Sequence, residues 1–556
     1  AGPGDVALFW YSGHGSEQPV APQFAHLEPT GTSQSVVCHD SRGGGVPDLT
    51  DKELSALLDA VAAGGVHVVA VLDCCHSGGG TRAPEVTYRG LPASGSAPSG
   101  YVRELVDPPA RREAHVALSA CQPFEKAREQ RVDGRMRGVF SAALLGALRT
   151  LAACATYREL LTAARARVED AAGEQVPVLY PVTPDGPADQ PFLGGTARAA
   201  AGFTLRHGHA GWEVDGGHCH GIPETTADDP VLFAVRDEGV LQATAVRPAS
   251  TTVQPVGWQP DPQRLYPVVL AAAPDPPATV VLGGLPDDDP AALDLVRQAV
   301  DTGPSAHVRI VAEGSSAPGL RLRVATAGRG FRILRGDGAP ATADVPGRTA
   351  AAALVVAARL DHIARWTRLK DLDNRGSSVA GAVRVEIAPV LPGHGPLDCP
   401  TLLPDERGEI VLRYAGGPDG WTHPEVFVRL RNTTPHRLWC VLLDLTDRYR
   451  AHASLFPGAW VGPHLAAAAY EGDPIPVTLP PDTPPEPGAR VRDWLKLIVS
   501  DEPFDSAAFD LPRLDAPIEG TRDLPTRTIT ASRPDTAPTA DWATSVVSLV
   551  TEVPAG

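Results

Sequence analysis

The segments Val6-Ala-Leu-Phe-Trp-Tyr-Ser-Gly-His-Gly15 and His67-Val-Val-Ala-Val-Leu-Asp-Cys-Cys-His-Ser-Gly78 point most directly to the fold of this chain. Each begins with a short apolar run and ends in a turn that contains glycine and polar residues. Runs that are apolar throughout suit strands that are covered on both faces of a parallel sheet. His115-Val-Ala-Leu-Ser119 has the same character and is predicted to be a third strand.

Helices are predicted between and after these strands. Thr50 and Glu53 have the spacing of a capping box, and the apolar residues that follow, up to Val61, recur on one helical face. Residues 139–151 and 157–171 have the pattern of two further helices. Alternating strands and helices predict an α/β sheet with flanking helices.

Length and composition narrow the class of protein. A chain of 556 residues is too long for one hydrophobic core, so we expect two to four domains. The net charge of −17 argues against a nucleic-acid partner, and no apolar run approaches the length of a membrane span. Eight cysteines without a C-x-x-C pair favour a reducing cytoplasm over a disulfide framework. Heavy use of Ala, Gly, Pro and Arg indicates a bacterial source.

Changes in composition along the chain suggest five parts. These are an α/β domain over residues 1–196, a small β-rich domain over 197–275, a mixed α/β segment over 276–379, a β-sandwich-like domain over 380–515 and a Pro/Thr-rich tail over 516–556. Residues 79–113 interrupt the first part with a stretch rich in Gly, Pro, Ser and Arg, which predicts an exposed loop.

His14 and Cys75 are the residues in this pattern that carry chemistry. A thiol becomes a strong nucleophile as a thiolate, and a neighbouring imidazole can accept its proton. Each of the two residues follows a buried strand directly, and ligands of open α/β sheets bind beyond the carboxyl ends of strands. The backbone amides of Gly15 and Cys75 are candidates for an oxyanion hole. The sequence therefore predicts a Cys-His dyad.

These motifs resemble the paired signatures of caspase-like cysteine peptidases, most closely the metacaspase and orthocaspase branch. Residues 118–129, 138–144 and 175–179 resemble later segments of that domain in the same order. The resemblance implies that Cys75, rather than Cys74, is the nucleophile and that His14 is the general base. It also implies that Ser12 and Asp73 line the pocket for a basic substrate residue. The alternative for Asp73 is a turn residue that caps the backbone after Cys75.

The chain departs from this family in two respects. The family domain begins with strands that precede the His14 strand, and they are missing from this sequence, which starts at Ala1. What precedes Ala1, a signal peptide included, is open. Calcium-dependent members carry acids at positions that hold Lys52 and Arg82 here, so the calcium site is expected to be lost. No metal and no cofactor are predicted.

The resulting functional hypothesis is a cysteine endopeptidase that cleaves proteins after Arg or Lys, in bacterial stress response, regulated cell death or phage defence. The arginines of the 79–113 loop, Arg82, Arg89, Arg103, Arg111 and Arg112, are candidate self-cleavage sites. The alternative is an inactive caspase-like scaffold. Under either hypothesis the C-terminal region is expected to bind a regulatory protein or ligand.

Overall fold

The N-terminal third of the chain is built on one four-stranded sheet. The computed structural model describes residues 2–555 with gaps, of which the longest are 76–86, 94–114, 195–202 and 515–540. The sheet has the order β1-β5-β7-β10, with β1 (Val6–Ser12), β5 (His67–Asp73), β7 (His115–Ser119) and β10 (Val178–Tyr180). The first three strands are parallel, and β10 is antiparallel to β7. The predicted α/β sheet is confirmed.

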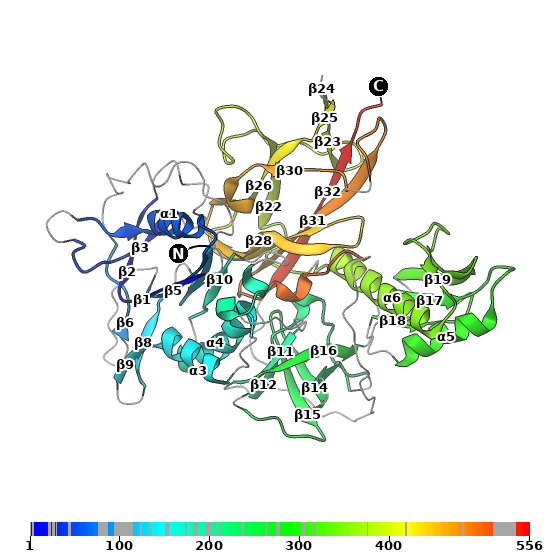
Figure 1. Ribbon diagram of the computed structural model, residues 1–556, viewed down its shortest axis with the longest axis horizontal. Helices are drawn as coiled ribbons and strands as arrows, with labels where there is room; N and C mark the ends of the chain where they lie inside the picture. The colour runs from blue at the N-terminus through cyan, green and yellow to red at the C-terminus, as the bar shows by residue number, and fades with distance from the viewer. Residues whose placement is uncertain are drawn as a thin grey trace.

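Helices cover both faces of the central strand β5 (Figure 1), whereas Val6, Leu8 and Phe9 of the edge strand β1 stay exposed, contrary to the expectation of cover on both faces. Val69 and Val71 of β5 belong to a core with α3 (Val139–Thr150) and α4 (Tyr157–Ala172). Val68 and Ala70 pack in a second core with α1 (Asp51–Ala62). Neighbouring residues of a strand point to opposite faces, so a strand between two helical layers must be apolar throughout. Thr50 and Glu53 form the expected capping box at the start of α1.

Two small sheets flank the carboxyl ends of β1 and β5. One has the order β2-β3-β4, and its strands are β2 (Gly15–Pro19), β3 (Thr32–Val36) and β4 (Leu49–Thr50). The other has the order β6-β8-β9, with β6 (Thr87–Tyr88), β8 (Arg128–Val132) and β9 (Arg135–Gly138). The short strand β6 comes from the predicted 79–113 loop, of which the structure describes residues 87–93.

The described residues of the C-terminal two thirds form a small two-stranded sheet of β24 (Ala415–Gly417) and β25 (Gly420–Thr422) and three larger β structures. The first is a closed barrel of β11 (Phe203–Gly208), β12 (Gly211–Val214), β13 (Leu232–Val235), β14 (Gly239–Val246), β15 (Thr251–Val256) and β16 (Tyr266–Ala272). The second is a five-stranded sheet, β17 (Ala278–Leu282), β18 (Val308–Ile310), β19 (Leu320–Ala327), β20 (Gly330–Arg335) and β21 (Val345–Pro346), which packs against α5 (Pro290–Thr302) and α6 (Ala350–Asp371).

The third is a pair of sheets that share one hydrophobic core. One sheet consists of β22 (Val383–Pro389), β26 (Glu425–Asn432), β29 (Ala466–Ala468) and β30 (Ile475–Pro476). The other has the order β23-β32-β31-β27-β28, with β23 (Glu409–Arg413), β32 (Trp542–Glu552), β31 (Arg490–Ser500), β27 (Leu438–Leu445) and β28 (Ala451–Val461).

One sequence-based boundary was wrong. Residues 516–556 were expected to form a tail, but residues 542–552 form β32, which pairs with β31 along its whole length and with β23 on its other side. Val550 is fully buried in this strand. The Pro/Thr-rich composition of residues 516–540 obscured the apolar run that follows it. Residues 515–540 lie outside the described part of the chain.

The N-terminal domain contacts the C-terminal structures directly. Arg165 of α4 forms an ion pair with Asp505 at 2.8 Å, and the Asp505 carbonyl oxygen lies 2.7 Å from Nε2 of His220. One loop after β31 therefore contacts both the α/β domain and the segment that follows β12. Among the described residues, none of the helices is both long enough and apolar enough to cross a membrane.

Candidate active site

The predicted site residues lie at the carboxyl ends of two neighbouring strands. Ser12, the last residue of β1, pairs in register with Asp73, the last residue of β5. The Gly13 amide donates a hydrogen bond to the Asp73 carbonyl at 3.3 Å, which extends the pairing into the turns. His14 and Cys75 each follow two residues later. The parallel register thus brings the two motifs to one edge of the sheet.

Two backbone amides at this edge point at the same oxygen atom. The N–H groups of Gly15 and Cys75 both donate to the carbonyl oxygen of Arg89, at 3.0 Å and 2.8 Å. Donors at about 2.7–3.1 Å from one oxygen are the arrangement that stabilises an oxyanion. A Cβ atom at position 15 would lie 1.9 Å from the Cys75 carbonyl oxygen, so this close approach requires glycine.

The Arg89 side chain enters a pocket formed by the predicted pocket residues. Its guanidinium donates to Ser12 Oγ at 2.5 Å and to the Asp73 carbonyl oxygen at 3.0 Å. The same guanidinium lies 3.7 Å from the Asp73 carboxylate and 3.0 Å from that of Glu129. Arg89 is only 8% exposed. A basic side chain therefore occupies this pocket, held by one hydroxyl and two acids.

Asp73 lies on the floor of the pocket and is fully buried. Burial raises the pKa of its carboxyl group, and the charge of Arg89 and hydrogen bonding to Ser141 partly offset this shift. The Ser141 amide donates to Oδ2 at 3.0 Å. A Cβ atom on Gly138 would lie 2.0 Å from that oxygen and 2.8 Å from Arg89 Cζ, so only glycine leaves room for the pair.

The backbone around Arg89 binds as an added strand. β6 pairs antiparallel with β8, with Thr87 opposite Glu129. The Arg89 amide then donates to the Ala127 carbonyl at 3.0 Å, and the Leu91 amide donates to the Gly15 carbonyl at 2.9 Å. Strand addition of this kind is a common mode of peptide recognition, because main-chain hydrogen bonds hold the peptide while pockets read alternate side chains.

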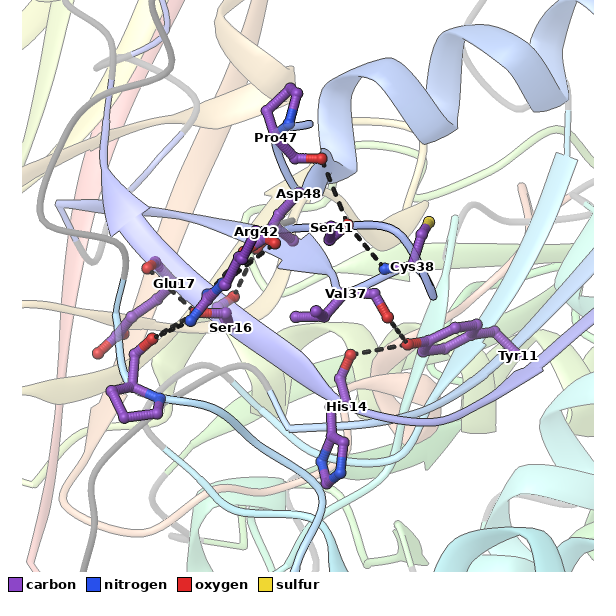
Figure 2. A network of polar contacts seen from close by, with 12 residues as sticks. Tyr11, His14, Ser16, Glu17, Val37, Cys38, Ser41, Arg42, Pro47 and Asp48 are labelled. Carbon is purple, nitrogen blue, oxygen red and sulfur yellow. Dashed lines mark hydrogen bonds and ion pairs between the residues drawn. The ribbon is translucent and has the colours of Figure 1, made fainter. Parts of the chain in front are cut away.

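A polar network holds the far end of this strand (Figure 2). The Pro92 carbonyl accepts hydrogen bonds from Arg42 at 2.9 Å and from the Ser16 hydroxyl at 3.1 Å. Arg42 is itself fixed by an ion pair with Asp48 at 2.6 Å. Residues 87–92, which we call the resident strand, are therefore anchored on both sides of Arg89.

The Cys75 thiol is buried beneath the resident strand. It donates a hydrogen bond to the Ala127 carbonyl at 3.3 Å. Burial raises the pKa of the Cys75 thiol to about 11 and that of the Cys74 thiol to about 12. Because a thiolate is the reactive form, both thiols are poorly reactive in this arrangement.

His14 is exposed next to this cleft, and among the described residues no hydrogen bond joins its imidazole to Cys75. Its carbonyl oxygen lies 2.7 Å from the Tyr11 hydroxyl, which also contacts the Val37 carbonyl at 2.8 Å. In Figure 2 the imidazole points away from Tyr11. Tyr11 therefore fixes the turn that bears His14.

Comparison with known proteins identifies this part of the chain. Residues 1–187 match the family described as the caspase domain. Residues 1–187 are a caspase domain. A stretch of 76 residues is 37% identical to Metacaspase-1 of Plasmodium falciparum (isolate 3D7). It spans 14% of the chain and 12% of the metacaspase, so the chain covers a small part of that relative. The predicted resemblance is confirmed for this domain.

Several residues of the caspase domain cleft were missed from sequence. Glu129 supplies the second carboxylate of the pocket, although nothing in its local sequence marks that role. Ala127 acts through its backbone carbonyl, which leaves no trace in a side-chain motif, and Ser141 contributes its backbone amide and its side chain to Asp73. Gly138 leaves the space that Asp73 and Arg89 occupy. His76, Gly78 and Arg82 lie outside the described residues.

Proposed function

We propose that the caspase domain is a cysteine endopeptidase that cleaves protein chains after Arg and, more slowly, after Lys. The observation that carries this proposal is the position of Arg89. Its carbonyl oxygen meets the two amides while its guanidinium meets Ser12, Asp73 and Glu129. A substrate arginine would need the same contacts to present its carbonyl carbon to Cys75. Arg is favoured because its planar group can bridge several acceptors at once.

In the proposed reaction the Cys75 thiolate attacks the carbonyl carbon of the basic residue. The negative charge then collects on the oxygen held by the amides of Gly15 and Cys75. His14 acts as the base that takes the thiol proton and passes it to the leaving amine. The peptide C–N bond breaks, and a water molecule hydrolyses the thioester to release a carboxylate and restore the thiol.

The first substrate is proposed to be the chain itself, cut between Arg89 and Gly90. Arg89 already makes the contacts proposed for a substrate arginine, and the other four candidate arginines lie outside the described residues. Cleavage would let the resident strand leave the cleft. Until then the strand competes with every other substrate, so the uncut protein is expected to have little activity on added peptides.

Mass spectrometry of the full chain during incubation at neutral pH tests the proposal. The parent should yield fragments that end at Arg89 and begin at Gly90. Cys75→Ala should leave the chain whole, and Cys74→Ala should cut at close to the parent rate as the matched control. His14→Ala should slow the cut strongly. A chain that is cut in Cys75→Ala but not in Cys74→Ala would reverse the nucleophile assignment.

The alternative, an inactive caspase-like scaffold, draws support from the Cys75 thiol, which is protonated and bonded to Ala127 rather than to His14. Under that alternative the resident strand would be a permanent part of the fold. The parent chain would then stay whole and would cleave no arginine peptide after titration of its thiols. Cytoplasmic location and roles in stress response, cell death or phage defence stay predictions.

A further inference from the structure

The residue before Arg89 also has a binding site of its own. The Tyr88 ring is half-buried and packs against the main hydrophobic core of the caspase domain. Lys126 Nζ lies over this ring at 5.1 Å from its centroid, and the Arg128 guanidinium carbon lies at 5.9 Å. The ring therefore sits between an apolar wall and two cations.

A buried side chain holds the backbone that carries Arg128. The amide of buried Gln175 accepts a hydrogen bond from the Arg128 backbone N–H at 3.0 Å and donates to the Ala120 carbonyl at 2.9 Å. Gln175 thus holds the backbone at Arg128, next to Ala127, whose carbonyl binds the Arg89 amide. Lys126 and Arg128 thus belong to the same segment that pairs with the resident strand.

From this arrangement we infer that the cleft selects an aromatic residue immediately before the basic one. This inference rests on the proposed peptidase function and names its substrate class: extended segments with an aromatic–Arg pair. Successive residues of a strand point to opposite sides, so Tyr88 and Arg89 are read by separate sites. The face of an aromatic ring carries negative potential and attracts cations within about 6 Å.

Other side chains fit this site less well. An aliphatic residue can cover the apolar wall but offers no negative face to Lys126 and Arg128. A carboxylate would attract the cations, but its desolvation against the hydrophobic core would be unfavourable. Cyclohexylalanine, which matches phenylalanine in size and lacks the π-face, therefore separates the ring's electrostatic contribution from its area.

Peptides with Arg fixed before the cleaved bond and Tyr, Phe, cyclohexylalanine or Glu before that Arg provide the test, with the self-cleaved full chain as enzyme. We expect kcat/KM for Phe to exceed that for cyclohexylalanine by about twofold to tenfold. Lys126→Met together with Arg128→Met should bring this ratio close to one. Arg135→Gln, which removes a cation from the next strand, should keep it. Equal rates for the two residues, or a preference for Glu, would overturn the inference.

A second measurement does not need the chain's own activity. In Cys75→Ala, added trypsin can cut after Arg89 only when the resident strand leaves the cleft. Replacing Tyr88 by Leu should speed this cut by about twofold to tenfold, and Tyr88→Phe should not. Equal trypsin rates for the Leu and Phe variants would refute the aromatic site. If the chain cleaves none of the arginine peptides while trypsin cuts the Leu variant faster than the Phe variant, only the peptidase function would be refuted.

Discussion

Asp73 is the residue on which the proposed preference for basic substrates depends most. It is fully buried, and its Oδ1 atom has no hydrogen-bond partner among the described residues. A buried carboxylate with an unmet acceptor is costly unless a cation is nearby. The guanidinium of Arg89, 3.7 Å from the Oδ2 atom of the same carboxylate, is that cation, and the Ser141 amide donates a hydrogen bond to Oδ2.

Asp73→Asn should therefore slow cleavage after Arg while it keeps the shape of the pocket. The substitution removes the negative charge 3.7 Å from the guanidinium, and an interaction with a charged group is worth roughly 1.5–3 kcal/mol, or about tenfold to a hundredfold in kcat/KM. Fluorogenic peptides varied at the residue before the cleaved bond measure the effect. Glu129→Gln should cost less, because Glu129 is 26% exposed and water can replace it. Preference for Asp, or an unchanged rate on Arg, would remove Asp73 from the pocket.

Cys75 should react slowly with iodoacetamide in the uncut chain. Its pKa is raised to about 11 by burial, so below that pH the unreactive thiol predominates. The labelling rate should rise with pH toward 11 and should increase at neutral pH after self-cleavage uncovers the sulfur. Exposed Cys38 serves as the internal control, because it should be labelled quickly before and after the cut. Rapid labelling of Cys75 in the uncut chain would contradict this account.

At the scale of elements, the first turn of α1 decides the expected response to calcium. Lys52 forms ion pairs with Asp51 at 2.6 Å and with Glu28. Glu53 is engaged in the capping box with Thr50. The acids near this turn are therefore already paired with Lys52, which in its ammonium form repels a divalent cation.

Self-cleavage should consequently proceed at the same rate with added calcium and with a calcium chelator. The readout is the appearance of the fragment that ends at Arg89. Lys52→Met provides a comparison, because it removes the ammonium group and keeps the length of the side chain. A large loss of rate in the chelator would show that the predicted loss of the calcium site is wrong.

At the scale of the whole molecule, β32 connects two strands of the C-terminal sandwich that would otherwise have no partner on that side. β32 lies between β23 and β31, parallel to the first and antiparallel to the second. Both neighbouring strands are distant from β32 in sequence, so the sheet can form completely only after residues 542–552 have joined it. Figure 1 shows β32 running through this part of the molecule beside β31.

Val550→Asp should unfold the sandwich, because it buries an unpaired carboxylate in a fully buried position. Val546→Asp is the matched control on the same strand, since Val546 is 44% exposed. Thermal unfolding followed by circular dichroism should show a large loss of stability for the first variant and little change for the second. Similar stability of the two variants would mean that β32 is not needed in the sheet.

The sequence by itself determined the strands β1, β5 and β7, the capped helix α1 and the two motifs that end beside each other. Each of these features depends on residues close together in the chain: an apolar run, a capping box, or a glycine turn. The adjacency of Ser12 and Asp73 follows from the same information, because both end neighbouring parallel strands. Local periodicity and the right-handed connection between parallel strands are enough to predict these features.

Only the tertiary structure revealed that Arg89 enters the pocket. Its position there follows from the pairing of β6 with β8, about forty residues away. Glu129 joins the pocket, and Tyr88 meets its two cations, through that same pairing. β32 likewise became a strand through partners far along the chain. Such long-range pairings depend on packing and hydrogen bonds that no local pattern of residues records.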